Sequence, residues 1–139
     1  MKIGFVGSKH GGNEYQNEIL EELLLAMEPE EVHHGDRIGS DVQVHGICRR
    51  LSIPIVVHPP NHKELRGFCK GYKFIHEPKS YISRNKYIVN STDIIITMPD
   101  SLSESFKSDT WATIRYAKKY LKPLVIIMLD GTVVEKNIS

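Results

Sequence analysis

Short apolar runs recur along the chain, and each is followed by a cluster of turn-forming residues. Runs of Val and Ile that are too short for helices are typical of β-strands that are covered on both faces. The last run is followed by an Asp130-Gly131 turn, which allows Thr132–Val134 to return as a small edge strand. The five runs that predict buried strands are Lys2–Gly7, Glu31–Gly35, Ile53–His58, Asp93–Met98 and Leu124–Leu129.

Between these runs the apolar residues change to a helical spacing. From Asn13 to Met27 they recur every three or four positions, which predicts one buried stripe on a helix with Asn13 as its N-cap. The segment Asn61–Lys79 has no clean period, and only a short helix is expected within it. The predicted helices are Asn13–Met27, Ser40–Leu51, Lys63–Phe68, Ser80–Asn90 and Ser108–Leu121, with Pro99–Lys107 as a polar loop.

Strands that alternate with helices are the signature of a parallel sheet with helices on both faces. The chain has 139 residues, a length that suits one domain spanning residues 1–139. We therefore expect a single open α/β sandwich, in which ligands bind beyond the carboxyl ends of the strands.

Charge and cysteine content narrow the classes of function. The 18 Lys and Arg residues balance 17 Asp and Glu residues to a net charge of +1, so no bulk attraction to nucleic acid or to an anionic membrane is expected. No apolar run approaches the roughly 18 residues of a membrane span, and the N-terminus runs straight into a strand without a signal peptide. Cys48 and Cys69 do not form a disulfide framework and fit a reducing, cytoplasmic setting.

No metal site is expected. The seven histidines are scattered, and no two of them stand at i, i+4 on a predicted helix, the spacing of a helical zinc site. His33 and His34 are neighbours, and on a strand they point to opposite faces of the sheet.

Glycine-containing loops follow two of the predicted strands and lead into helices. The free N–H groups of a helix N-terminus attract anions, although the same loops also serve as simple strand-to-helix turns. A P-loop is excluded because Asn13-Glu14 stand where Lys-Ser/Thr would be needed. A third helix start and an Arg-Asn pair complete the candidate ligand-binding set. Its members are Gly7, Ser8 and Gly11; Gly35, Asp36, Arg37, Gly39, Ser40 and Asp41; Arg84 and Asn85; and Pro99, Ser108, Asp109 and Thr110.

Signals for catalysis are weaker. Several carboxylates fall at the expected ligand edge, so acid–base chemistry remains open, but neither cysteine has a histidine partner in the sequence and no G-x-S-x-G elbow occurs. Trp111 either stacks on a base or packs in the core. The stretch Lys63–Lys73 is basic with interleaved aromatic residues, which could hold a nucleotide or a nucleic-acid backbone.

The ordered series of motifs resembles the SLOG superfamily, whose Rossmann-like domains are related to the cytokinin-activating Lonely Guy proteins. The resemblance is to a short, stand-alone branch found in bacteria and phages, and it runs from Lys2 to about Leu129. It is carried by the Gly-Ser turn at Gly7-Ser8, G-D-x-x-G-S-D at 35–41, R-N at 84–85, D-I-I-I-T-x-P at 93–99 and S-D-T-W-A-T-I-R-Y-A-K-K-Y-L-K-P at 108–123. It implies a Rossmann-like three-layer α/β/α sandwich with a mainly parallel five-stranded sheet, and a pocket for a nucleotide-type ligand. Relatives of this kind are often dimers or larger homo-oligomers.

The sequence departs from the enzymatic members of that superfamily. Phosphoribohydrolases and N-glycosidases of the family resemble P-G-G-x-G-T-x-x-E in the last loop, and their glutamate engages the ribose. Here Asp109 precedes Thr110, and Thr113 stands in place of the glutamate. Threonine cannot act as a base or stabilise an oxocarbenium charge, so catalysis is disfavoured.

Three hypotheses follow for the function. The first is a protein without a resident cofactor that binds a phosphorylated nucleoside or a nucleotide-derived signalling molecule, as a sensor or a sequestering protein. The alternative is a nucleoside 5′-monophosphate N-glycosidase or phosphoribohydrolase that uses Asp36, Asp41 or Asp109. The third, a nucleic-acid module built on Lys63–Lys73, is disfavoured by the near-neutral net charge.

Overall fold

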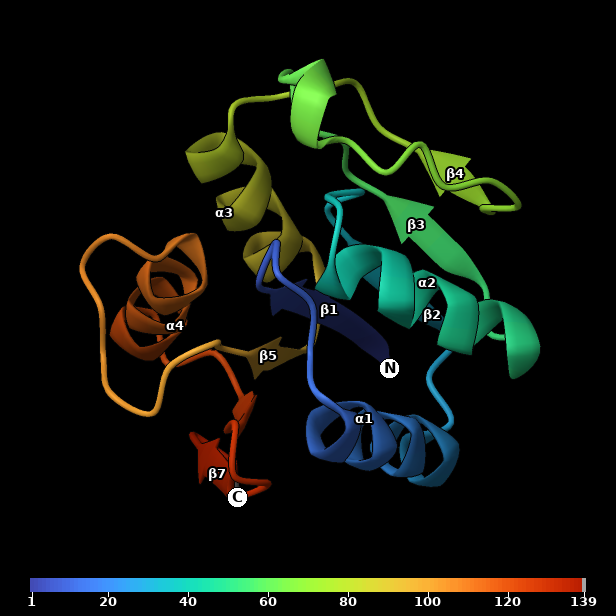
Figure 1. The fold of residues 1–139 in the computed structure, drawn as a ribbon. Coiled ribbons are helices and arrows are strands. Elements are labelled where there is room, and N and C mark those ends of the chain that lie inside the picture. Colours follow the sequence, from blue (N-terminus) through green and yellow to red (C-terminus); the bar gives the residue numbers. More distant parts are fainter. Residues whose placement is uncertain (139) are drawn as a thin grey trace.

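A computed structural model describes residues 1–138 of the chain and forms one mixed sheet with helices on both faces (Figure 1). The sheet has seven strands in the order β4-β3-β2-β1-β5-β6-β7. All pairs are parallel except β6 with β7. The strands are β1 (Lys2–Gly7), β2 (Glu31–His34), β3 (Ile55–Val57), β4 (Phe74–Ile75), β5 (Ile94–Met98), β6 (Leu124–Ile127) and β7 (Val133–Lys136). The helices are α1 (Glu14–Met27), α2 (Ser40–Arg50), α3 (Tyr81–Ser91) and α4 (Asp109–Lys119), with a 3-10 turn, η1 (Lys63–Leu65).

The two faces of the sheet carry separate apolar cores, which confirms the three-layer α/β/α fold class. Residues of α1 and α2, such as Leu20 and Val44, pack against one face. Residues of α4, such as Ile114, pack with Val89 of α3 against the other face. Successive side chains of a strand point to opposite faces, so a central strand supplies both cores and must be apolar along its length.

Two strands were not among the five expected, and both lie at the edges of the sheet. The turn at Gly131 returns the chain as β7, as the sequence allowed, although the strand extends to Lys136. The sequence pattern missed β4, because its two residues, Phe74 and Ile75, lie in the segment without a clean period. Edge strands are short and half-exposed, so they lack the continuous apolar run that identifies a buried strand.

The order of the strands places a switch point between β1 and β5. The chain builds outward from β1 to β4, and then returns to the other side of β1 for β5. The connections at a switch point diverge to opposite faces and leave a crevice beyond the carboxyl ends of the strands. Gly7 and Met98 end paired strands at this point, so the loops that follow them frame the crevice.

Asn13 caps α1 as expected. Its side chain accepts a hydrogen bond from the Gln16 backbone N–H, and the Gln16 side chain accepts one from the Asn13 backbone N–H. Gln16 also donates to the carbonyl oxygens of Pro99 and Ile127, both at 2.9 Å. One buried amide therefore ties the start of α1 to the ends of β5 and β6.

Trp111 packs in the core rather than standing free for a base. It is 7% exposed and belongs to the cluster under α4, and its indole N–H donates to Ser101 Oγ at 2.9 Å.

None of the helices in the described part of the chain combines the length and apolar character that a bilayer span needs.

Candidate functional site

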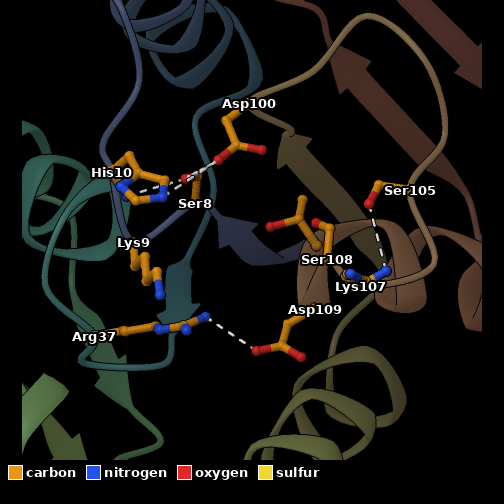
Figure 2. Close-up of a pocket in the computed structure, with 10 residues that line it drawn as sticks. Ser8, Lys9, His10, Arg37, Asp100, Ser105, Lys107, Ser108 and Asp109 are labelled. Atoms are coloured by element: carbon orange, nitrogen blue, oxygen red, sulfur yellow. Dashed lines mark hydrogen bonds and ion pairs between the residues drawn. The ribbon is translucent and has the colours of Figure 1, made fainter.

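A polar cleft of about 250 Å³ lies at the switch point, beyond the carboxyl ends of β1 and β5. Three loops and one helix start form it, and Figure 2 shows their side chains converging from opposite walls. The volume lies just below the range for small-molecule sites, about 300–1,000 Å³. The lining residues are Ser8, Lys9 and His10 after β1; Arg37 after β2; Asp100, Ser105 and Lys107 after β5; and Ser108, Asp109 and Thr110 at the start of α4.

The loop after β1 is fixed by hydrogen bonds on both sides of Ser8. Ser8 Oγ donates to Asp100 Oδ2 at 2.9 Å and accepts from the His10 backbone N–H at 3.0 Å. The Ser8 carbonyl oxygen accepts from the backbone N–H groups of Gly11 and Ser40. The Ser8 hydroxyl therefore links the loop after β1 to the loop after β5.

The loops after β1 and β2 approach each other so closely that two positions require glycine. A Cβ on Gly7 would overlap the side chain of Ser40. Gly39 has φ +92°, and a Cβ there would overlap the backbone of Lys9. Glycine alone adopts such a φ without strain, so the loops after β1 and β2 interlock at these two positions.

Positive charge dominates one wall of the cleft. Lys9 and Arg37 lie on this wall beside His10, and Lys107 adds a third cation from the opposite wall, beside Ser105 and Ser108 (Figure 2). The first turn of α4 faces the same space, and the Ser108 side chain caps that helix by accepting from the Trp111 backbone N–H at 3.3 Å. A helix N-terminus carries a partial positive charge, so the cations and the helix start together favour an anionic ligand.

Two carboxylates oppose these cations. Arg37 Nη1 donates to Asp109 Oδ2 at 3.2 Å, and the dashed line in Figure 2 marks this pair across the cleft. Asp100 accepts from Ser8 and lies 4.0 Å from His10 Nε2. The cleft is therefore internally neutralised in part, and an anion must compete with Asp109 for Arg37.

The structure brings five of the sequence-predicted residues into the cleft and places the others around it. Ser8, Arg37, Ser108, Asp109 and Thr110 line the cleft. Gly7, Gly11 and Gly39 shape the loops, and the Pro99 carbonyl is taken by Gln16. Gly35, Asp36, Ser40, Asp41, Arg84 and Asn85 are buried behind it, and Asn85 also lines a smaller pocket of about 70 Å³ between α3 and α4.

Arg84 is a buried structural cation. It is 3% exposed, and its guanidinium donates to the carbonyl oxygens of Gly35 and His58 and to Asn85 Oδ1. Burial lowers the pKa of Arg84 from its usual value, and the nearby Asp41 carboxylate partly offsets that shift. Arg84 therefore holds the ends of β2 and β3 and does not reach the cleft.

The two buried aspartates behind the cleft have different environments. Asp36 accepts from Arg66 Nε at 2.8 Å and from the Cys69 backbone N–H at 2.9 Å, so both of its oxygens are in use. Asp41 accepts one backbone N–H, from Arg37 at 3.2 Å. Desolvation raises the pKa of Asp41 to about 6, although Arg84 and Arg37 favour its charged form.

Five lining residues were not among the predicted ligand contacts. Lys9, His10 and Asp100 follow β1 and β5 directly, so knowledge of the strand order would have selected them. Ser105 and Lys107 lie far along an irregular loop, and no sequence signal marks them. Thr113 lies outside this cleft, where its hydroxyl donates to the Asp109 carbonyl oxygen within α4.

His34, His45 and Cys69 bring three metal-ligand atoms within 4.8 Å of one another. The hydrogen bonds assign the tautomers of both histidines. The Asp36 backbone N–H donates to His34 Nδ1, so His34 Nε2 carries the proton and donates to His45 Nδ1; His45 Nε2 then donates to the Lys70 carbonyl oxygen. These bonds occupy the ring nitrogens, and burial raises the pKa of Cys69 to about 12. The group therefore fits a hydrogen-bond chain better than a metal site.

A second histidine cluster lies on the opposite face of β2 and β3. Glu31 Oε1 and His33 Nε2 are 2.9 Å apart, and His33 Nδ1 and His58 Nε2 are 2.8 Å apart. His76 stacks on His58 with a centroid distance of 4.3 Å. Burial lowers the pKa of His33 and His76, and lowers that of His58 to about 2. His33 and His34 do point to opposite faces, as expected from their adjacent positions on a strand.

Comparison with known proteins identifies the fold. The chain matches no protein-family model and no curated protein sequence. Among solved structures it is similar to the molybdenum cofactor binding protein from the phototrophic bacterium Rippkaea orientalis, with 17% identity and a TM-score of 0.70 over 91% of this chain and 76% of that chain. It is also similar to the molybdenum cofactor carrier protein from Chlamydomonas reinhardtii, with 17% identity and a TM-score of 0.65 over 90% of this chain and 74% of that chain.

A third similar structure is DNA processing protein A from Streptococcus pneumoniae, with 15% identity and a TM-score of 0.66 over 90% of this chain and 49% of that chain. At these identities the likeness shows a shared Rossmann-like fold and does not extend to function.

Proposed function

Starting from a Rossmann-like fold with a cationic cleft at its switch point, we propose that this protein binds a phosphorylated small molecule of nucleotide type in that cleft, as a sensor or a sequestering protein of the SLOG superfamily. The observation that carries the proposal is the convergence of Lys9, Arg37 and Lys107 on the start of α4. Charge-assisted hydrogen bonds from such groups are the usual means of holding a phosphate.

The similar structures give independent support. Two of them are described as proteins that bind or carry the molybdenum cofactor, a small molecule. A fold of this kind binds its ligands at the carboxyl ends of the strands, and the cleft lies at that edge. The proposal therefore agrees with the location of ligand sites in this fold class as well as with the charge of the cleft.

A hydrolase of the N-glycosidase or phosphoribohydrolase class is the alternative. Of its three candidate carboxylates, Asp36 is fully engaged, Asp41 is buried, and Asp109 alone lines the cleft, paired with Arg37. A general acid or base must reach the reacting group. Asp109 is consequently the residue through which this alternative would operate.

Thermal denaturation with a library of nucleoside mono- and diphosphates, cyclic nucleotides and sugar phosphates tests the proposal. We expect at least one phosphorylated compound to raise the melting temperature of the wild type, and Arg37→Ala to reduce that shift. Glu104→Gln, which removes an ion pair with Arg115 outside the cleft, serves as the matched control. The absence of a shift with every phosphorylated compound would contradict the proposal.

Chromatography of the same mixtures separates binding from turnover. Binding without chemistry leaves the nucleotide intact after long incubation at high protein concentration. Release of free base that is lost in Asp109→Asn would instead establish the hydrolase.

A further inference from the structure

Unsatisfied polar atoms gather beside the cleft. Within residues 1–138, five buried side-chain atoms lack a hydrogen-bond partner, and four of them come from the start of α2, the loop before it and the first residue of α3. Buried polar groups are normally paired, so a cluster of atoms without a partner in the chain is a candidate for contact with a ligand or with ordered water. The four atoms are Arg37 Nε, Ser40 Oγ, Asp41 Oδ1 and Tyr81 Oη.

The four side chains belong to one group of neighbours behind the cleft wall. The Arg37 guanidinium lies over the Tyr81 ring, 4.8 Å from its centroid, and the Arg37 backbone N–H donates to Asp41 Oδ2. The Ser40 backbone N–H donates to the Ser8 carbonyl oxygen at 2.9 Å. Because Ser8 and Arg37 both line the cleft, the residues that carry the unpartnered atoms adjoin its wall.

The chemistry of these atoms differs from that of the cleft itself. Ser40 is fully buried and Asp41 is 5% exposed. A carboxylate oxygen without a donor requires an O–H or N–H group, while Arg37 Nε requires an acceptor. The hydroxyls of Ser40 and Tyr81 can serve as either. A phosphate would satisfy Arg37 but would be repelled by Asp41, so this place does not suit an anion.

A neutral group that both donates and accepts at adjacent atoms matches this set, and a pair of sugar hydroxyls is such a group. We propose that Arg37, Ser40, Asp41 and Tyr81 form a hydroxyl-binding subsite, so that the ligand of the cleft is a sugar phosphate or a nucleotide bound through its ribose. This inference rests on the proposed function, which supplies the phosphate. The proposal requires the Arg37 side chain to move, which the phosphate would allow by displacing Asp109.

The roles of the two regions are then distinct. Lys9, Lys107, the Nη groups of Arg37 and the start of α4 hold the phosphate, which gives affinity to any phosphorylated compound. Of the Arg37 guanidinium, only Nε belongs to the hydroxyl subsite. Asp41 accepts hydrogen bonds from the sugar hydroxyls, and Ser40 donates to them or accepts from them. These bonds discriminate among phosphorylated compounds. A site built to hydrogen-bond a hydroxyl rejects the analogue without it, because its buried polar groups are left unpaired.

Isothermal titration with three probes tests the subsite: inorganic phosphate, ribose 5-phosphate and 2-deoxyribose 5-phosphate. We expect the wild type to bind ribose 5-phosphate at least about tenfold more tightly than inorganic phosphate, with the deoxy compound weaker than the ribose compound. Asp41→Asn should weaken ribose 5-phosphate by about tenfold, the difference between a charged and a neutral hydrogen bond, and leave inorganic phosphate unchanged.

Tyr81→Phe gives a second variant that retains the ring beneath Arg37 and removes only the unpartnered hydroxyl. It should reduce the preference for ribose 5-phosphate by several-fold. Tyr87→Phe, on the same helix but against His58 and His76, is the matched control and should change nothing. If Asp41→Asn does not fold, Tyr81→Phe decides the outcome.

The failures are distinguishable. If phosphate and ribose 5-phosphate bind equally, or if the preference survives both variants, then water alone fills the place and the subsite is overturned while the phosphate site stands. If neither probe binds the wild type, the proposed function fails as well.

Discussion

Arg37 and Asp109 join opposite walls of the cleft, with Arg37 Nη1 3.2 Å from Asp109 Oδ2. Arg37 belongs to the loop after β2, and Asp109 is the first residue of α4. The carboxylate occupies the cation that an anionic ligand would use. The pair therefore acts as an internal competitor, and its strength sets part of the affinity of the cleft.

Asp109→Asn should consequently raise the affinity for inorganic phosphate. Removing the charge releases Arg37 and reduces repulsion of the ligand, and we expect an increase of about three- to tenfold at low ionic strength. Titration calorimetry at low and high salt measures the effect, which should shrink as salt screens the cleft. Unchanged or weaker binding would show that Asp109 supports the ligand rather than competing with it.

Arg84→Ala should lower the stability of the folded protein. The substitution leaves the Gly35 and His58 carbonyl oxygens buried without their donor, at a cost of about 2–4 kcal/mol in the free energy of unfolding. Urea denaturation measures this cost. A variant of normal stability that no longer binds phosphorylated ligands would instead make Arg84 a ligand contact.

Gly39→Ala should destabilise the protein and loosen the cleft. The position has φ +92°, and the added Cβ would overlap the Lys9 backbone, so we expect a loss of about 2–4 kcal/mol. Gly46→Ala is a matched control on α2, since a Cβ there meets nothing within 4 Å. That control should stabilise the fold by about 0.5–1 kcal/mol. Equal effects of the two substitutions in urea denaturation would refute the role assigned to Gly39.

Stability should fall as the pH is lowered below about 6.5. The pKa values of His33, His58 and His76 are lower in the folded protein than the unfolded value of 6.5. Below pH 6.5 the unfolded chain therefore binds more protons than the folded protein. Each histidine that stays neutral in the folded protein lowers the free energy of unfolding by about 1.4 kcal/mol per pH unit below 6.5. Unfolding free energies at pH 7 and pH 5 measure the slope.

Asp41 has the opposite sign, because its pKa is raised to about 6. Its contribution to stability is present below its unfolded pKa of 3.8 and is lost as the pH rises through 6. One carboxylate opposes several histidines, so the net slope follows the histidines.

His76→Asn should flatten the slope of stability against pH, since His76 belongs to the stack and is half-buried. A slope unchanged by this substitution would assign the acid sensitivity to other groups.

Much of the fold could be predicted from the sequence, because its central strands are buried on both faces. β1, β5 and β6 consist almost entirely of apolar residues, and such runs admit few other structures. Asn13 predicted the start of α1 through capping chemistry that involves only its own first turn. β4 could not be predicted, because two half-exposed residues form a strand only when β3 lies beside them.

The candidate site, like the fold, could be predicted from the sequence only in part. The local pattern selected Ser8, Arg37 and the start of α4, since each follows a strand or opens a helix. It could not show that Arg84 faces backbone carbonyls, or that Ser105 and Lys107 reach back to the cleft. Local propensity and hydrophobic periodicity act over a few residues, so they can be read directly from the sequence. The pairing of Arg37 with Asp109, and the orphaned atoms behind them, depend on the order of the strands, which is decided by packing among residues far apart in the chain.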